Sequence, residues 1–121
     1  MWLEGKVALV TGAGRNVGRG VAICLAREGA HVFLNDLAGA ALEEAVRACL
    51  DAGGKASPAA AALPDAAAVR DTFERLEREH GGPDILVNNA GIRNNDRGER
   101  GPFLKLELEA WRAYMARNLE A

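Results

Sequence analysis

The first stretch of this sequence that could do chemistry is the glycine-rich segment TGAGRNVG, residues 11–18, which follows the apolar run VALV. Backbone N–H groups at the start of a helix, together with the positive end of the helix dipole, bind anions such as phosphate. Gly12, Gly14 and Gly18 allow positive φ angles and leave room for a phosphate to approach the backbone. The segment therefore suits a phosphate site, and an ordinary tight turn is the alternative, since an isolated glycine-rich match is weak.

Asp36 adds a second feature to this loop, because it ends the next apolar run, HVFLND. An acidic residue about 20 positions after such a loop can accept hydrogen bonds from the adenosine ribose and would repel a 2′-phosphate. The loop and Asp36 together predict a dinucleotide and favour NAD over NADP. Arg15 points the other way, since a basic residue there can assist a 2′-phosphate. A helix-entry role for Asp36 is the plainer alternative.

The elements that would position these residues alternate between strand and helix patterns. Strands are predicted at residues 6–11, 31–36 and 84–91, and a weak one at 55–63 that should lie at an edge because it contains Pro58. Asp65 can cap the third helix. Four helical stripes are predicted: Val17, Val21, Cys24 and Leu25; Leu42, Ala45, Val46, Cys49 and Leu50; Val69, Phe73, Leu76 and His80; Leu108, Trp111, Met115 and Leu119.

This alternation predicts an α/β fold, the first half of a Rossmann-type doubly wound parallel sheet. About four strands are expected, in the order 3-2-1-4, with helices on both faces. The continuously apolar runs VALV and ILV suit strands that are buried on both sides.

Composition excludes several classes of function. The chain has 121 residues, 49% of them hydrophobic and 26% charged, which suits one globular domain. A net charge of −2 gives no basic surface for nucleic acid or membrane lipid. Neither a bilayer-spanning run nor a signal peptide is apparent. Cys24 and Cys49 have neither disulfide nor metal spacing, so we expect a cytoplasmic protein without a metal site.

Four segments in register, TGAGRNVG, NDL, DILVNNAG and WRAYMARNL, resemble the short-chain dehydrogenase/reductase family. The resemblance covers the whole chain. It implies that residues 1–121 are the N-terminal NAD(P)-binding part of a single Rossmann domain whose C-terminal half is absent.

The resemblance also implies roles for particular residues. Asn118 would hold a water in the catalytic proton relay, and Asn88 would tie the fourth strand to its neighbour. The residues expected at the cofactor are Gly12, Arg15, Asn16, Val17, Gly18, Asp36, Leu63, Asn89, Ala90 and Gly91. Among them, Gly12, Val17 and Gly18 would lie along the pyrophosphate.

The sequence departs from the family pattern at three places. Asn16 replaces the middle glycine of the loop, and asparagine tolerates the left-handed conformation, so we expect the turn to form. The Asn16 side chain would then make a local or ligand hydrogen bond. Ala62 stands where the family places an acidic residue near the adenine, which leaves a backbone contact from Leu63. The loop at residues 92–103 is longer than expected and would be a lid or a solvated excursion.

The family's proton-transfer residues are missing from this chain. Its members pass a hydride between the nicotinamide and an alcohol or carbonyl carbon, using a tyrosine, a lysine four residues later and a serine. Here the only tyrosine, Tyr114, is followed by Asn118 at that spacing, and the only serine is Ser57. We therefore expect the 121 residues alone to be inactive.

The favoured hypothesis is the cofactor-binding half of a longer oxidoreductase that acts on a small alcohol or ketone. It would form a dimer or tetramer when full length, by analogy with the family. A non-catalytic nucleotide-binding module is one alternative, and a fragment that pairs with a partner chain is another.

Overall fold

The computed structural model of the protein describes residues 1–91 and 107–119, without the side chains of Tyr114, Arg117 and Asn118. Strands and helices alternate along the chain, as the sequence predicted. The elements are β1 (Val7–Val10), α1 (Asn16–Arg27), β2 (His31–Leu34), α2 (Ala40–Asp51), β3 (Lys55–Pro58), α3 (Ala66–His80), β4 (Ile85–Val87) and α4 (Leu108–Asn118).

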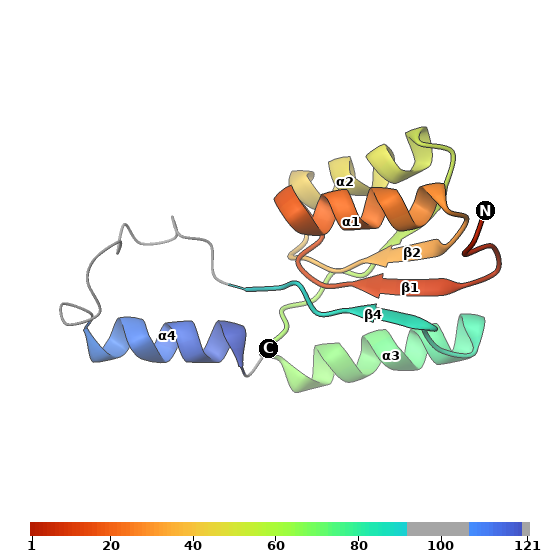
Figure 1. The fold of residues 1–121 in the computed structure, drawn as a ribbon. Helices are drawn as coiled ribbons and strands as arrows, with labels where there is room; N and C mark the ends of the chain where they lie inside the picture. The colour runs from red at the N-terminus through yellow and green to blue at the C-terminus, as the bar shows by residue number, and fades with distance from the viewer. Residues whose placement is uncertain (92–106, 120–121) are drawn as a thin grey trace.

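The four strands form one parallel sheet in the order β3-β2-β1-β4 (Figure 1). Val7 lies opposite His31 in the β1–β2 pair, and Ala8 lies opposite Ile85 in the β1–β4 pair. The predicted strand order is therefore confirmed, although each strand is shorter than predicted. β3 lies at the edge, where a strand containing Pro58 is tolerated.

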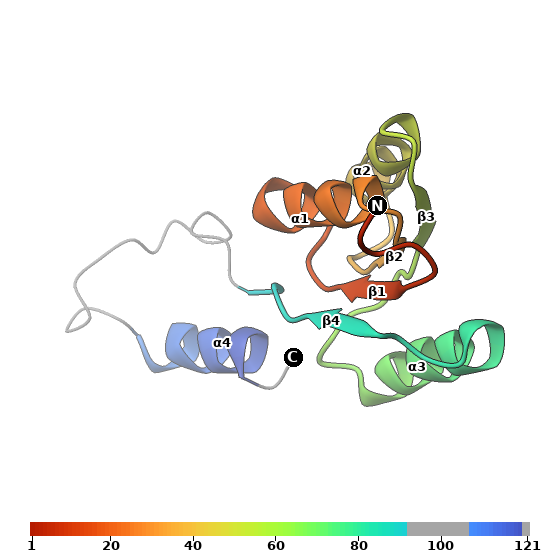
Figure 2. The ribbon, with the colours of Figure 1, turned by 45° about the vertical axis from the view of Figure 1, so that its right-hand side comes forward.

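The helices cover both faces of this sheet, as predicted. Figures 1 and 2 show α1 and α2 together on one face and α3 on the other. Alternate strand residues separate the two cores: Ala8 and Val10 belong to the core beneath α1 and α2, whereas Val7 and Leu9 belong to the core beneath α3. The apolar strand runs are thus buried from two sides, which explains why they do not alternate with polar residues.

The buried face of α1 differs from the predicted stripe. Its buried residues are Gly18, Ala22 and Ala26, whereas Cys24 is exposed and Val17 is 71% exposed. Small side chains at four-residue spacing let the helix lie close against the sheet, while the larger apolar residues flank the contact. The prediction was right for Val21 and Leu25, which pack against the core in part, and wrong for Val17 and Cys24, because it assumed that the bulkiest side chains mark the core face.

β4 is held against β1 by a two-way contact at Asp84, the residue that precedes the strand. The Val7 N–H donates to Asp84 Oδ2 over 2.8 Å, and the Asp84 N–H donates to the Val7 carbonyl, also over 2.8 Å. Among the described strands, the other side of β4 has no neighbour, and Leu86 is 47% exposed. β4 therefore presents an apolar edge among the described residues.

α3 begins at the predicted cap, where Asp65 accepts from the N–H groups of Ala67 and Ala68 over 3.0 and 3.2 Å. Its one fully buried residue among the described contacts is Leu76. At the C-terminal end of the helix, the His80 ring meets the rings of His31 and Phe33 on β2.

His31 is packed at the centre of these rings. Its ring stacks on Phe33 with centroids 4.7 Å apart and meets the edge of His80 at 4.9 Å. Its Nε2 atom is hydrogen bonded to Ser57 Oγ over 2.9 Å. Burial is the largest cause of a lowered pKa at His31. Nearby charges also act on it: His80, Lys55 and Arg75 lower the pKa, and Glu79 raises it.

We predict that acid weakens this packing. The unfolded chain binds a proton at His31 more readily than the folded chain does. Above about pH 6.5 the histidine is neutral in both states and does not affect the free energy of unfolding. Below that pH, protonation of the unfolded chain lowers the free energy of unfolding. Urea unfolding between pH 5 and 8 should show this dependence, and His31→Gln should make it shallower. An identical pH dependence in the variant would contradict the assignment.

Candidate functional site

The predicted cofactor residues gather in one groove at the carboxyl ends of β1, β2 and β4. The groove has a volume of about 260 Å³, and its lining contains nine of the ten residues proposed from the sequence. These are Gly12, Arg15, Asn16, Val17, Gly18, Asp36, Asn89, Ala90 and Gly91. Leu63, the tenth, lines an adjoining groove that shares four of these residues. The carboxyl edge beside a change in strand order is where α/β sheets bind ligands.

The turn between β1 and α1 has the backbone that the sequence predicted. Gly12 has φ +62°, and Asn16 has φ 51°, so asparagine does occupy the left-handed region in place of the family's glycine. Arg15 is the N-cap of α1, and its side chain makes no capping hydrogen bond. The first N–H groups of the helix therefore have no capping side chain, and the residues that carry them, Asn16, Val17 and Gly18, line the groove, where an anion can satisfy them. No hydrogen bond from the Asn16 side chain is described, so that part of the expectation stays a prediction.

Gly18 allows this turn to pack tightly. A Cβ atom at Gly18 would collide with the Gly12 carbonyl and lie 2.6 Å from Asn89 Nδ2. A Cβ at Gly12 would lie 2.9 Å from the Ala90 Cα atom. Only glycine fits at either position, because the opposing atoms are largely backbone and cannot move aside.

Asp36 is connected directly to the glycine-rich turn. Its Oδ2 atom accepts from the Gly14 N–H over 2.9 Å, and its Oδ1 atom accepts from the Leu37 N–H over 2.8 Å. A Cβ at Gly14 would lie 2.6 Å from Asp36 Oδ2, so glycine makes room for the carboxylate. This contact was not foreseen from the sequence. It fixes a negative charge at one end of a groove whose other end presents helix N–H groups.

Thr11 and Asn89 tie the turn to the end of β4. Thr11 Oγ1 accepts from the N–H groups of Asn89 and Ala90, each over 3.0 Å, and donates to the Val87 carbonyl over 3.3 Å. Asn89 Nδ2 donates to the carbonyls of Thr11 and Gly12, each over 3.2 Å. The end of β4 and the phosphate-type turn are therefore one hydrogen-bonded unit.

This network corrects the role expected for Asn88. Asn89 ties β4 to its neighbour, whereas Asn88 is exposed and lines a small pocket on the α3 face. Side chains alternate along a strand, and Val87 faces the α1 core, so Asn89 points to that side as well. This alternation along the strand could have indicated from the sequence that Asn89, and not Asn88, makes the structural contact.

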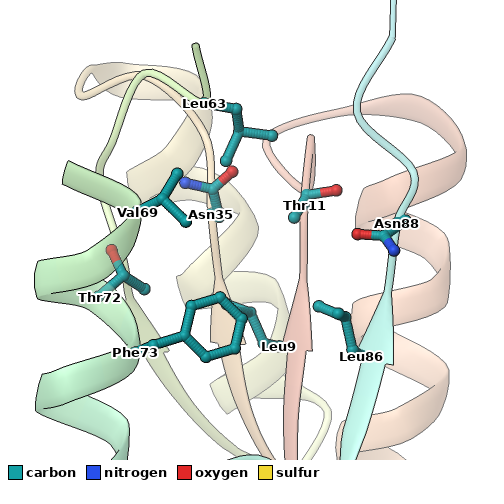
Figure 3. Close-up of a pocket in the computed structure, with 9 residues that line it drawn as sticks. All are labelled: Leu9, Thr11, Asn35, Leu63, Val69, Thr72, Phe73, Leu86 and Asn88. Carbon is teal, nitrogen blue, oxygen red and sulfur yellow. The ribbon is translucent and has the colours of Figure 1, made fainter. Parts of the chain in front are cut away.

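The pocket beside α3 has a volume of about 90 Å³, and Figure 3 shows its lining on β1, β4 and α3. Most of it is apolar, including Leu9, Phe73 and Leu86, with Asn88 near the carboxyl end of β4. Leu86 and Phe73 are 47% and 37% exposed. This face of the sheet is therefore incompletely covered by the described residues.

Asn35 is a site residue that the sequence analysis missed. It is only 2% exposed, and its Nδ2 donates to the carbonyls of Ala59 and Ala61 over 2.9 and 3.3 Å. It thereby holds the segment after β3 beside Asp36, and that segment forms one wall of the adjoining groove. The only sequence feature that could have indicated this role is the position of Asn35, a polar residue directly after the apolar run of β2.

The residues expected to take part in catalysis lie outside the described part of the chain or away from the grooves. Asn118 is the last residue of α4, and its side chain is outside the described residues, as is the loop at 92–103. Ser57 lies on β3, bonded to His31, and lines neither groove. Burial raises the pKa of the Cys49 thiol, which disfavours the reactive thiolate.

The described residues offer neither a metal centre nor a membrane span. They contain no group of three or more histidine, cysteine or acidic side chains placed to hold a metal ion. None of their helices combines the length and apolarity that crossing a bilayer requires.

Comparison with known proteins agrees with this geometry. A family model described as short chain dehydrogenase matches residues 6–121. A probable short-chain type dehydrogenase/reductase from Bradyrhizobium diazoefficiens is 42% identical over 116 residues, covering 96% of this chain and 41% of that protein. A probable oxidoreductase, EphD, from Mycobacterium tuberculosis is 41% identical over 110 residues, covering 91% of this chain and 18% of that protein.

A solved structure of a metagenomic short-chain oxidoreductase in complex with NADP superposes with a TM-score of 0.84. It is 34% identical, and the match covers 99% of this chain and 52% of that one. The chain therefore belongs to the short-chain dehydrogenase family, a family of NAD(P)-dependent oxidoreductases. It spans about half or less of the length of these relatives.

The packing at Gly18 gives a stability prediction with a matched control. We expect Gly18→Ala to lower the free energy of unfolding by at least about 1–3 kcal/mol, because its Cβ meets backbone that cannot yield. A Cβ at Gly20, on the same helix, meets nothing within 4 Å, so Gly20→Ala should be neutral or raise stability by up to about 1 kcal/mol. Denaturant unfolding measures both, and equal effects would contradict the proposed packing.

Thr11 gives a second prediction. Thr11→Val keeps the shape of the side chain but leaves the Ala90 N–H without its acceptor, while the Asn89 N–H retains only the Val87 carbonyl, so we expect a loss of about 1–3 kcal/mol. Thr11→Ser retains the hydroxyl and should lose less. Thermal unfolding of the two variants checks the difference, and a valine variant as stable as the serine variant would show that the hydroxyl is dispensable.

Proposed function

We propose that residues 1–121 are the NAD-binding part of a short-chain oxidoreductase, with the diphosphate seated on the β1–α1 turn. The observation that carries this proposal is the single groove that joins the turn, the end of β4 and Asp36. Helix N–H groups face one part of it, and a fixed carboxylate stands at the other. A diphosphate and an adjoining ribose diol match these two ends in charge and hydrogen bonding.

Charge decides which dinucleotide is favoured. An anion at the N-terminus of α1 gains about 0.3–2 kcal/mol from the helix dipole, depending on burial. The Asp36 carboxylate would accept from the ribose hydroxyls and repel a phosphate at the 2′ position. Arg15 is exposed at the same groove and would offset part of that repulsion. We therefore assign NAD as the preferred cofactor and NADP as the weaker one.

The remainder of the oxidoreductase would lie beyond this chain. The apolar edge of β4 and the half-covered pocket beside α3 are the surfaces that further strands and helices of the same domain would bury. The tyrosine, lysine and serine of the family's proton transfer would also come from there. The substrate is proposed to be a small alcohol or ketone, and Asn118 to hold a water in the proton relay. The full protein is proposed to be a cytoplasmic dimer or tetramer, and the 121 residues alone to be inactive.

Substitution of Asp36 tests the assignment. We expect Asp36→Ala to weaken NAD binding and to narrow the preference for NAD over NADP. Asp36→Asn keeps an acceptor for the Gly14 N–H but removes the charge, so it should improve NADP binding relative to NAD while preserving the turn. Isothermal titration calorimetry with NAD and NADP measures both effects.

Asp51 supplies the control, because it is an exposed aspartate at the end of α2, away from the groove lining. Asp51→Ala should leave both dissociation constants unchanged. If Asp36→Ala and Asp36→Asn bind the two cofactors as the unaltered protein does, Asp36 does not contact the ribose.

A further inference from the structure

The two edges of the parallel sheet are built differently. Among the described strands, β4 ends the sheet on one side with three apolar residues, and Leu86 is 47% exposed there. β3 ends it on the other side with the sequence Lys-Ala-Ser-Pro, residues 55–58. An exposed edge strand can pair with a strand of another molecule, and lysine and proline at an edge oppose such pairing. The composition of β3 therefore indicates an edge at which pairing is opposed.

The hydrogen-bonding pattern decides which backbone groups of β3 face outward. The Ala59 N–H donates to the Leu34 carbonyl over 2.8 Å, toward β2. In a parallel ladder the backbone groups of successive residues point to opposite sides of the strand, so Ala56 and Pro58 direct theirs away from β2. Proline has no N–H group. The outward groups of β3 are thus the Ala56 N–H and the carbonyls of Ala56 and Pro58.

Arg75 on α3 engages one of these carbonyls. Its Nη1 atom donates to the Pro58 carbonyl over 3.0 Å. The same guanidinium lies 5.3 Å from the centroid of the Phe33 ring, and its Nε atom donates to Glu79 Oε1 over 3.4 Å. A second strand would need the Pro58 carbonyl as an acceptor and would find it occupied by a held positive charge. Within the described part of the chain, Ala56 alone on this edge keeps both outward groups without a partner.

We propose that Arg75, together with Pro58, prevents strand addition at the β3 edge and so keeps the protein from associating through this side of the sheet. The excluded partner is an extended strand, above all β3 of a second copy, which a two-fold axis would place antiparallel. The contact is independent of the candidate cofactor site, since neither Pro58 nor Arg75 lines either of its grooves.

The variant that carries both Pro58→Ala and Arg75→Gln tests this proposal, because it adds an outward N–H group and releases the carbonyl of residue 58. Sedimentation velocity over a concentration series should show a species of about twice the mass that the unaltered protein has at the same concentration. In that species the Ala56 amide should exchange with deuterium more slowly than in the unaltered protein, because it pairs across the new contact.

Two results would overturn the proposal. One is a folded double variant that keeps the mass of the unaltered protein. The other is association that leaves exchange at the Ala56 amide unchanged, since the molecules would then meet through a different surface. If circular dichroism shows that the double variant does not fold, Pro58→Ala alone decides the question. It should raise the weight-average mass with concentration, and an unchanged mass would contradict the proposal.

Arg78→Gln supplies the control for the loss of one positive charge. Arg78 is exposed on the same helix, and none of the described hydrogen bonds or ion pairs joins its side chain to β3. We expect this variant to keep the mass of the unaltered protein, whereas Arg75→Gln should associate. Equal association of the two variants would show that net charge controls association, and would overturn the role assigned to Arg75.

Discussion

The close packing of the β1–α1 turn against the end of β4 is the contact on which the rest of the structure depends. Two glycines permit it, since a Cβ at Gly18 would collide with the Gly12 carbonyl and one at Gly12 would meet Ala90. Hydrogen bonds of Thr11 and Asn89 then join the turn to the end of β4. Because the turn cannot move without β4, the N–H groups at the start of α1 stay directed into the groove.

The same turn also positions the negative charge of the site. The Gly14 N–H holds the Asp36 carboxylate, so the end of β2 and the start of α1 are fixed relative to one another. A ligand that binds both would find its two partners already in place, which reduces the entropy lost on binding. Asn35 donates hydrogen bonds to the segment after β3 and so fixes the position of the wall that this segment forms in the adjoining groove.

Much of this arrangement could be predicted because the informative residues stand at the carboxyl ends of strands. Parallel strands bring those ends to one edge, and the family resemblance named the residues that stand there, so strand order and groove lining could both be predicted. Features that depend on which way a side chain faces were harder to predict. Asn89 takes the structural role expected of Asn88 while it still lines the groove, because side chains alternate along a strand. α1 fully buries Gly18 and two alanines, and its larger apolar residues only in part or not at all. Contacts between distant segments, such as Gly14 with Asp36, have no local sequence signal.

The central claim is that the amides of this turn receive a dinucleotide's diphosphate, and NMR tests it most directly. Titration of NAD into ¹⁵N-labelled protein should shift the backbone amides of Gly12, Val17 and Gly18, together with those of Ala90 and Gly91, along one saturable curve. A folded spectrum whose amide signals at residues 12–18 stay fixed while NAD binds elsewhere, or does not bind, would contradict the account.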